Sequence, residues 1–227
     1  MIRTAPRQTQ LTVLEPSAAA FGQARDERQS SLRQARRRLI LDAAQQVFVK
    51  DGLEGATVRA MAAAAGCTTG ALYPLFESKE AIYAALLYES LSRLYAAVSD
   101  AAASGRTAQA ALRAGALAFL DYYRERPDEV ALGLYLWGSV RPRGLSPALD
   151  AGLNQRLADT LGLLEETIRQ TSRRGAATAR TETAALFAFL IGAVVTHQTG
   201  RLRVLSRDLD GIARLHIDAL VDRLRRR

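Results

Sequence analysis

The segment from residue 57 to residue 80, TVRAMAAAAGCTTGALYPLFESKE, constrains the fold more than any other part of the chain. It holds two short helical patterns separated by one glycine. Thr57 suits an N-cap position, and apolar residues follow it at helical spacing. Gly66 stands where a helix ends in a left-handed residue, and Thr68 is expected to cap the next helix. A gap this short favours a helix-turn-helix, whose second helix enters a DNA major groove while the first crosses the backbone.

The pattern extends on both sides of this segment. From Gln34, apolar residues recur at helical spacing until Asp51 and Gly52 supply a stop, and Ser78 is expected to cap a long fourth helix. We therefore predict a three-helix DNA-binding domain over residues 31–80. Its small core is expected to contain apolar residues from all three helices: Phe48, Val58, Met61, Ala65, Leu72 and Phe76.

Residues 81–227 keep the helical period, and no segment shows the alternation of a strand. Helices are expected at about 107–125, 127–138, 147–174, 181–199 and 207–225. The chain is thus predicted to be all-α, with about nine helices: the DNA-binding domain and then a larger helical bundle. Residues 1–30 lack sustained periodicity and are interpreted as a flexible extension or a mis-assigned start.

The charge balance favours polyanionic partners, because 31 Lys and Arg face 23 Asp and Glu, a net charge of +8. Six of the arginines lie within residues 25–38, which indicates a basic arm. A lone cysteine, Cys67, excludes an internal disulfide and fits a reducing, cytoplasmic compartment. The two histidines, His197 and His216, have no cysteine partner, so neither a metal site nor a cofactor is expected.

No segment predicts export or membrane insertion. The first 22 residues lack the apolar run of a signal peptide, and residues 184–196, the nearest candidate for a span, are too few to cross a bilayer.

The stretch from Arg36 to Glu80 resembles the N-terminal domain of the TetR family of transcriptional regulators. The resemblance rests on the string LILDAAQQVFVKDGLEGATV, the turn AAAAGCTTGALY, and Phe76 followed by SKE, over about a fifth of the chain. It implies a DNA-reading head followed by a variable helical domain for ligand binding and dimerisation. One departure is Pro74 with Leu75, where the family commonly has His or Tyr and another aromatic residue. Because proline disfavours the α conformation of its predecessor, the reader helix is expected to end at about Tyr73.

Position and resemblance together give the expected DNA contacts. The start of the reader helix can meet phosphates or base edges, and Tyr73 and Lys79 match the family's phosphate contacts. The basic arm can neutralise phosphates or enter the minor groove. Other interpretations are a pure cap for Thr68, a packing requirement for Gly70 and a solvated surface position for Arg59. The complete set is Arg36, Arg37, Arg38, Thr57, Arg59, Thr68, Thr69, Gly70, Ala71, Tyr73 and Lys79.

Aromatic residues of the bundle are candidates for lining a mostly apolar cavity for an apolar or aromatic ligand. Each of them also fits an ordinary core position. The candidates are Tyr95, Phe119, Tyr122, Tyr123, Tyr135, Trp137, Phe187 and His197. The last two long helices have apolar faces suited to a dimer interface, which the resemblance favours, and burial within one subunit is the alternative explanation of such faces. The interface candidates are Leu186, Phe189, Leu190, Ala193, Val194, Ile212, Leu215, Ala219 and Leu220.

These features predict a homodimeric transcriptional repressor that a small ligand releases from a near-palindromic operator, with reader helices about 34 to 36 Å apart or a multiple of it. An activator or a ligand-insensitive regulator of the same family is an alternative. A helical enzyme or ligand carrier with a vestigial DNA head is a remote one, because catalytic motifs are not visible and no enzyme is expected. A nonspecific architectural DNA protein would need broader basic coverage.

Overall fold

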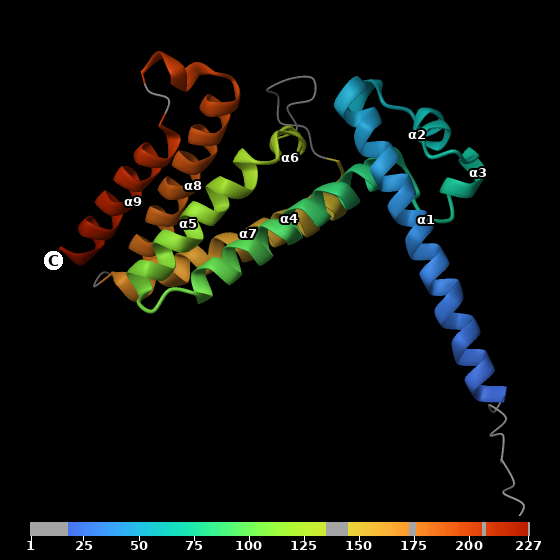
Figure 1. The fold of residues 1–227 in the computed structure, drawn as a ribbon, viewed down its shortest axis with the longest axis horizontal. Helices are drawn as coiled ribbons and strands as arrows, with labels where there is room; N and C mark the ends of the chain where they lie inside the picture. Colours follow the sequence, from blue (N-terminus) through green and yellow to red (C-terminus); the bar gives the residue numbers. More distant parts are fainter. Residues whose placement is uncertain (1–17, 135–144, 173–175, 206–207, 227) are drawn as a thin grey trace, which may run out of the picture. The chain divides into compact units, whose positions relative to one another are not determined.

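The computed structural model describes residues 18–134, 145–172, 176–205 and 208–226, and within these ranges the chain contains nine α-helices, one short 3-10 helix and no strand (Figure 1). The helices are α1 (Ala18–Gly55), α2 (Val58–Ala64), α3 (Thr69–Leu72), α4 (Lys79–Ala103), α5 (Ala108–Arg124), α6 (Pro127–Gly133), α7 (Pro147–Thr171), α8 (Ala176–Gln198), η1 (Arg201–Val204) and α9 (Leu209–Arg225). The all-α prediction is confirmed. The chain separates into two compact units, residues 1–39 and residues 40–227.

The first helix corrects the expectation of a flexible segment before residue 30. α1 begins at Ala18, and every described side chain from Gln23 to Arg36 is exposed, with Leu32 at 72%. This part of the chain is rich in Ala, Gln and Arg, which favour helices through intrinsic propensity. A search for apolar periodicity misses such a helix, because no buried face specifies it.

The head has the predicted core. Phe48, Met61, Leu72 and Phe76 are buried, whereas Val58 and Ala65 are half-buried and pack against them. The head meets the bundle through an edge-to-face contact between Phe48 and Tyr83, with ring centroids 5.1 Å apart. The N-terminal part of α4 therefore shares a continuous core with the head.

The turn between α2 and α3 follows the sequence signals. The Thr57 hydroxyl oxygen accepts a hydrogen bond from the Ala60 amide at 3.1 Å, and Gly66 adopts a left-handed φ of 65°. Thr68 occupies the N-cap position of α3, but its side chain makes no capping hydrogen bond, which corrects that expectation.

The reader helix ends where Pro74 predicts, although for a different reason. Tyr73 has φ −57° and ψ −35°, so it remains in the α region despite the proline that follows. Proline has no amide hydrogen to continue the helical hydrogen bonding, and the chain turns there, with the Leu75 and Phe76 amides both donating to the Leu72 carbonyl.

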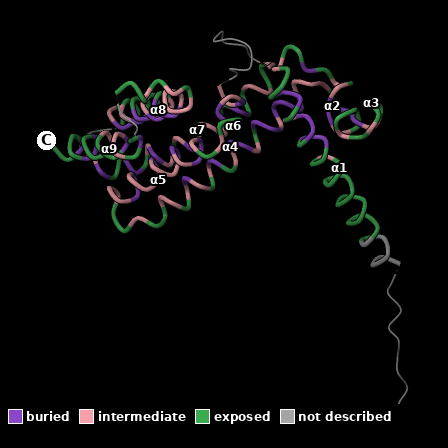
Figure 2. The backbone as a smooth tube through the Cα atoms, turned by 45° about the horizontal axis from the view of Figure 1, so that its top comes forward, coloured by how far each residue is buried: buried purple, intermediate pink, exposed green. Residues whose placement is uncertain are grey.

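The bundle is built on α4, α5 and α7, which lie side by side, with α8 and α9 packed against them (Figure 1). Their buried residues line the inner sides of the helices (Figure 2). Side-chain oxygens of Ser78, Thr107, Ser146 and Asp208 cap α4, α5, α7 and α9. Gly105 allows the tight α4–α5 turn, because a Cβ there would lie 2.3 Å from the Ala111 amide nitrogen.

Two helix boundaries in the bundle differ clearly from the sequence-based ranges. α8 begins at Ala176, five residues before its expected start, and α6 ends at Gly133 with Leu134 as its C-cap, whereas residues 135–138 of its expected range fall outside the described residues. The short η1 was not predicted. By length and composition, α8 is the one described helix that is long and apolar enough to cross a membrane, with a mean hydropathy of 1.4 over 18 residues, which corrects the shorter run predicted from sequence. A core helix can meet the same criteria, and α8 packs against α5, α7 and α9.

Candidate functional site

The outer surface of the head displays the start of the reader helix. Thr68 and Gly70 are exposed, Thr69 and Ala71 are half-buried, and Tyr73 is 56% exposed. Leu72, on the opposite side of the same turn, is fully buried. The buried leucine fixes the orientation of α3, so the polar residues around it face outward, where DNA can reach them.

Gly70 has free space around it. A Cβ added there would meet only the Thr68 hydroxyl oxygen, at 3.8 Å, which is an ordinary contact distance. A packing requirement therefore does not explain this glycine. The open space is compatible with close approach of a DNA backbone, as the resemblance implies.

Lys79 has a structural role that the sequence did not reveal. Its ammonium group donates to three backbone carbonyl oxygens at the end of α1 and just after it: Leu53 at 2.8 Å, Glu54 at 3.3 Å and Ala56 at 3.3 Å. The left-handed backbone of Gly52, with φ 68°, breaks the regular helix just before these carbonyls. Lys79 thus connects the first residue of α4 to the end of α1, whereas its predicted phosphate contact stays a prediction.

The remaining predicted DNA contacts lie in two places. Arg59 is exposed on α2, and Thr57 is exposed while its hydroxyl oxygen caps that helix. Arg36 and Arg38 are exposed and Arg37 is half-buried; all three belong to the first of the two compact units. Their contribution to the DNA surface stays a prediction.

The bundle contains a cavity that is partly open to solvent, with an empty volume of about 520 Å³ when the open space at its mouth is included. It lies among α4, α5, α6, α7 and α8, and within the described part of the chain its lining residues are all uncharged. They are Leu87, Leu91, Tyr123, Val130, Gly133, Leu134, Leu153, Asn154, Leu157, Phe187 and Ile191. The surroundings suit a mostly apolar molecule.

Two of the predicted ligand residues, Tyr123 and Phe187, line this cavity. Phe119 is fully buried and contacts the rings of both, at centroid distances of 5.3 and 6.0 Å. Tyr95 is not part of the lining and packs instead beneath the Arg156 guanidinium, 4.3 Å from its ring centroid.

The other four candidates do not line the cavity or cannot be placed. Tyr122 belongs to a separate polar network, and His197 is half-buried and is not part of the lining. Tyr135 and Trp137 lie outside the described residues. The aliphatic lining residues were missed, because the spacing of a leucine marks it as buried but does not show whether it borders a void.

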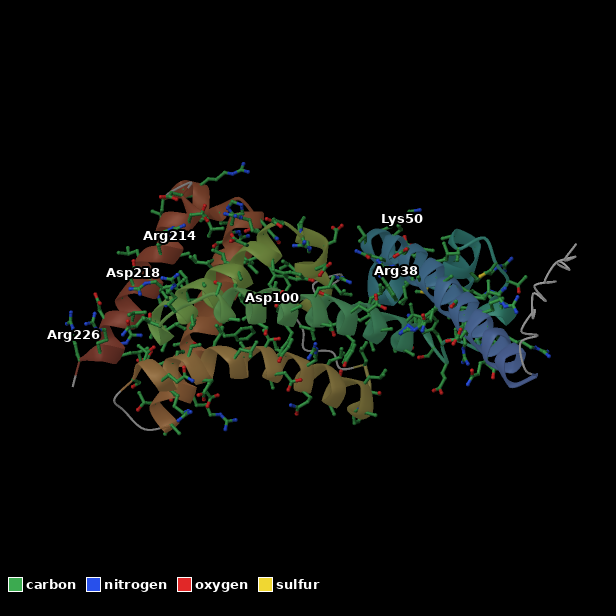
Figure 3. All side chains as sticks on the ribbon, turned by 60° about the horizontal axis from the view of Figure 1, so that its bottom comes forward. Arg38, Lys50, Asp100, Arg214, Asp218 and Arg226 are labelled. Carbon is green, nitrogen blue, oxygen red and sulfur yellow. The ribbon has the colours of Figure 1, made fainter. Side chains whose placement is uncertain are left out.

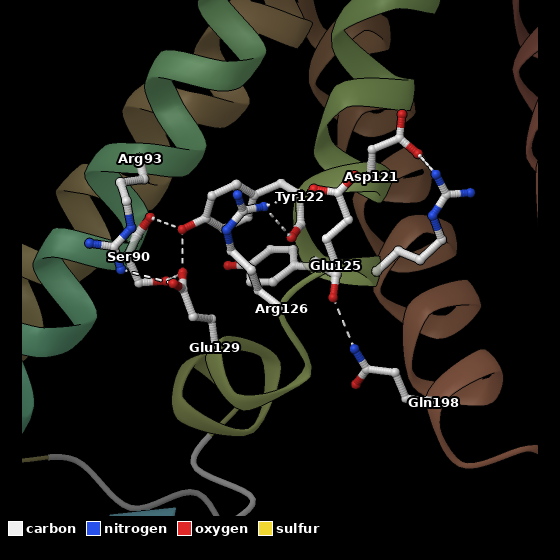
Figure 4. A network of polar contacts seen from close by, with 10 residues as sticks. Ser90, Arg93, Asp121, Tyr122, Glu125, Arg126, Glu129 and Gln198 are labelled. Carbon is white, nitrogen blue, oxygen red and sulfur yellow. Dashed lines mark hydrogen bonds and ion pairs between the residues drawn. The ribbon is translucent and has the colours of Figure 1, made fainter. Parts of the chain in front are cut away.

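A buried polar network joins α6 to α4 and α5 next to the cavity (Figure 4). The Glu129 carboxylate accepts hydrogen bonds from the Ser90 hydroxyl at 2.7 Å, the Arg93 guanidinium at 2.9 Å and the Tyr122 hydroxyl. Burial disfavours the charged carboxylate, but the hydrogen bonds from Tyr122 and Ser90 and the charge of Arg93 outweigh it, so the pKa of Glu129 is lowered. A second link between α4 and α6 is the hydrogen bond that the Tyr83 hydroxyl donates to the Leu132 carbonyl oxygen at 2.6 Å.

The predicted dimer face divides into a buried and an accessible part. Side chains that fill the core of the subunit, and so cannot meet a partner as they stand, are Leu186, Leu190, Ala193, Val194 and Leu220. Phe189 and Ile212 are half-buried, Ala219 is exposed and Leu215 is 74% exposed. Phe189 stacks on the His216 imidazole, with ring centroids 3.7 Å apart.

The outer side of α8 carries small residues that were not predicted as contacts. Exposed positions on it include Ala177, Ala184, Ala185, Ala188 and Gly192. Charged residues dominate the outer side of α9, where Arg214 and Asp218 are exposed (Figure 3). Asp218 accepts a hydrogen bond from Arg113 of α5 at 2.6 Å.

Residues 40–86 match the family model described as bacterial regulatory proteins, tetR family. The HTH-type transcriptional repressor KstR2 of Rhodococcus jostii is 38% identical over 85 residues, which cover 37% of this chain and 42% of that protein. The HTH-type transcriptional repressor AcnR of Corynebacterium efficiens is 39% identical over 64 residues, which cover 28% of this chain and 34% of that protein. The chain therefore spans less than half the length of either relative, and neither of them is an enzyme.

The fold is shared over a greater length. The crystal structure of a transcriptional regulator FadR from Bacillus subtilis, in complex with stearoyl-CoA, superposes with a TM-score of 0.65 at 19% identity. The superposition covers 81% of this chain and 96% of that one. The helical bundle thus continues the likeness beyond the head, at the level of fold.

Proposed function

We propose that this chain, which belongs to the tetR family of bacterial regulatory proteins, is a sequence-specific DNA-binding transcriptional repressor. The observation that carries the proposal is the outward face of α3. A buried Leu72 orients that helix, while exposed Thr68, Gly70 and Tyr73 stand on its accessible side. A helix held in this way supplies polar groups and free amides to a major groove, and the relatives with a matching head are repressors.

The repressor is proposed to act as a homodimer through α8 and α9. Only 28% of the apolar 18-residue window of α8 is buried within the subunit. Water contact with such a face is unfavourable, and small residues such as Ala188 and Gly192 allow a second helix to approach closely. A second copy of the chain covers this face by two-fold symmetry, which in turn calls for a near-palindromic operator.

A small apolar effector in the bundle cavity is proposed to release the operator. FadR, which shares this fold, was crystallised in complex with stearoyl-CoA. Two of the cavity-lining residues, Leu87 and Leu91, lie on α4. Lys79, the first residue of the same helix, is hydrogen-bonded to the end of α1. An effector that binds the DNA-incompetent arrangement more tightly than the competent one shifts the population through this helix.

Selection of binding sites from random DNA with the purified protein tests the proposal. We expect a near-palindromic consensus that binds far more tightly than scrambled DNA. With four phosphate-contacting cations per subunit, the log-log salt dependence should have a slope of about −7 on both DNAs. Equal affinity for selected and scrambled DNA would overturn the proposal and would favour a bundle with a non-functional head.

A transcript measurement separates repression from activation by the same head. Deletion of the gene should raise transcription of a neighbouring gene that has the selected site in its promoter. A fall in that transcript would identify an activator. If none of the tested effectors changes the affinity for the operator, the protein is a ligand-insensitive regulator.

A further inference from the structure

We infer that the effector is an uncharged, largely aliphatic molecule with one hydrogen-bond acceptor, such as a ketone or an ester, and that the Tyr123 hydroxyl donates to this acceptor. The inference rests on the proposed effector response and specifies its chemistry. It starts from the hydroxyl of a buried tyrosine to which none of the described residues forms a hydrogen bond.

Tyr123 lies on α5 and is only 4% exposed. Its hydroxyl lies 3.7 Å from the position that a Cβ would take at Gly133, and both residues line the cavity. Among the residues that the structure describes, none forms a hydrogen bond with this hydroxyl; the hydrogen bonds of Tyr123 with Gln198 and with the Arg126 amide both go to its backbone carbonyl. A buried polar group of this kind is paired in most proteins, so the cavity is where its partner belongs.

The ring of Tyr123 is held firmly. It packs edge-on against Phe119 and Tyr122, each at a centroid distance of 5.3 Å, and its carbonyl accepts a hydrogen bond from the Gln198 amide at 2.9 Å. The hydroxyl therefore has a fixed place beside α6. Binding to a group held in this way does not require further ordering of the side chain.

The hydroxyl is a donor at all ordinary pH values. Burial raises the pKa of Tyr123, and the nearby Tyr122 and the Glu129 carboxylate raise it further. Since none of the described lining residues is charged, a carboxylate or ammonium group placed among them would be buried without a charged partner from these residues. An uncharged acceptor avoids this cost and satisfies the hydroxyl.

The rest of the lining specifies the body of the ligand. Seven of the lining side chains are aliphatic: Leu87, Leu91, Val130, Leu134, Leu153, Leu157 and Ile191. The remaining polar side chain, Asn154, is exposed and thus lies where the cavity meets solvent. An aliphatic chain fits this surface by burial of apolar area, and the acceptor then fixes its orientation.

Three eight-carbon probes test the inference on the full chain without DNA: 2-octanone, octanoate and 1-octene. Binding is measured from the rise of the thermal unfolding midpoint with probe concentration. We expect 2-octanone to bind more tightly than octanoate. Tyr123→Phe should weaken 2-octanone binding by about threefold to tenfold and leave 1-octene binding unchanged.

The controls separate a lost hydrogen bond from a damaged fold. Tyr95→Phe removes a hydroxyl from a tyrosine that does not line the cavity and should leave all three affinities unchanged. Because the Tyr123 hydroxyl has no hydrogen-bond partner among the described residues, Tyr123→Phe should not lower the unfolding midpoint of the ligand-free protein. Equal 2-octanone affinity in wild type and Tyr123→Phe, an equal loss for 1-octene, tighter binding of octanoate, or no binding of any probe would each overturn the inference.

Operator affinity is measured separately on the same preparations without any probe. Failure of probe binding with intact operator discrimination overturns the effector chemistry and leaves the repressor proposal standing. Loss of operator discrimination in the wild-type protein overturns the repressor proposal, whatever the probes do.

Discussion

The Lys79 ammonium group donates to the Leu53 carbonyl oxygen over 2.8 Å, and so ties the start of α4 to the end of α1. Carbonyls at a helix end lack partners within the helix and carry partial negative charge, which a lysine satisfies. The same α4 borders the bundle cavity through Leu87 and Leu91. Helix α4 therefore has the Lys79 contact at its first residue and cavity-lining residues further along.

Replacement of Lys79 by Met keeps most of the stem and removes three hydrogen bonds to carbonyl oxygens. We expect the free energy of unfolding to fall by about 1 to 2 kcal/mol, because the carbonyls lose a charged donor while water still reaches part of the site. Urea unfolding measures the change. Lys50→Met, at an exposed lysine of α1, is the control and should change stability by less than about 0.5 kcal/mol.

The salt dependence of operator binding distinguishes the two roles of Lys79. If Lys79 only positions the head, Lys79→Met weakens operator binding without changing the log-log slope. If it also neutralises a phosphate in each subunit, the magnitude of the slope falls by about 2 for the dimer. If the variant keeps both the operator affinity and the salt slope of the wild type, Lys79 has no role in DNA binding.

Tyr73→Phe tests the predicted phosphate contact on the accessible side of α3. The hydroxyl of this 56% exposed side chain is available to DNA, so its removal should weaken binding to operator and random DNA alike by about threefold to tenfold. Gel shifts measure both affinities. Tyr88→Phe, at an exposed tyrosine of α4, is the matched control, and an equal effect in both variants would contradict a specific role.

Thr69→Ala tests base reading at the start of the reader helix. Thr69 is half-buried and is not the N-cap residue, so loss of its hydroxyl should change stability little. We expect a changed base preference at one position of each half-site, worth about 1 to 3 kcal/mol, in a repeated binding-site selection. An identical consensus would count against a base contact by this side chain.

Glu129→Gln tests the buried network between α6 and α4. Because the pKa of Glu129 is lowered in the folded protein, its stabilisation is complete above pH 4.5 and is lost as the pH falls through the lowered value. The variant should be less stable by about 1 to 3 kcal/mol at pH 7, and the difference should shrink below pH 4.5. Urea unfolding at several pH values measures it, and a constant difference across that range would show that ionised Glu129 is not the source.

Ala188→Arg tests the proposed dimer face on α8. Ala188 is exposed, so the subunit itself accommodates a long charged side chain, whereas a closely packed helix of a second copy does not. Light scattering should show a dimer for wild type and a monomer for the variant, with loss of operator affinity. Ala158→Arg, at an exposed position of α7, should remain dimeric; a wild-type monomer at all concentrations would contradict the interface.

The head could be predicted almost completely from sequence, because its signals act locally. A cap such as Thr57 or a left-handed glycine such as Gly66 specifies the backbone within a few residues, and both behave as expected. The family likeness lies in the same short span. The helical state of residues 18–30 was missed, because propensity without a buried face leaves no periodic pattern.

What the sequence determined by itself was therefore the helical period, the helix-turn-helix and the residues on its reader helix. Only the tertiary structure decided that Lys79 bonds the end of α1, that Leu87 and Leu91 border a void, and that Glu129 joins α6 to α4. Each of these depends on residues brought together from distant helices. Sequence spacing identifies the buried face of a helix, but the way that faces pack decides which buried side chains meet each other and which meet a cavity.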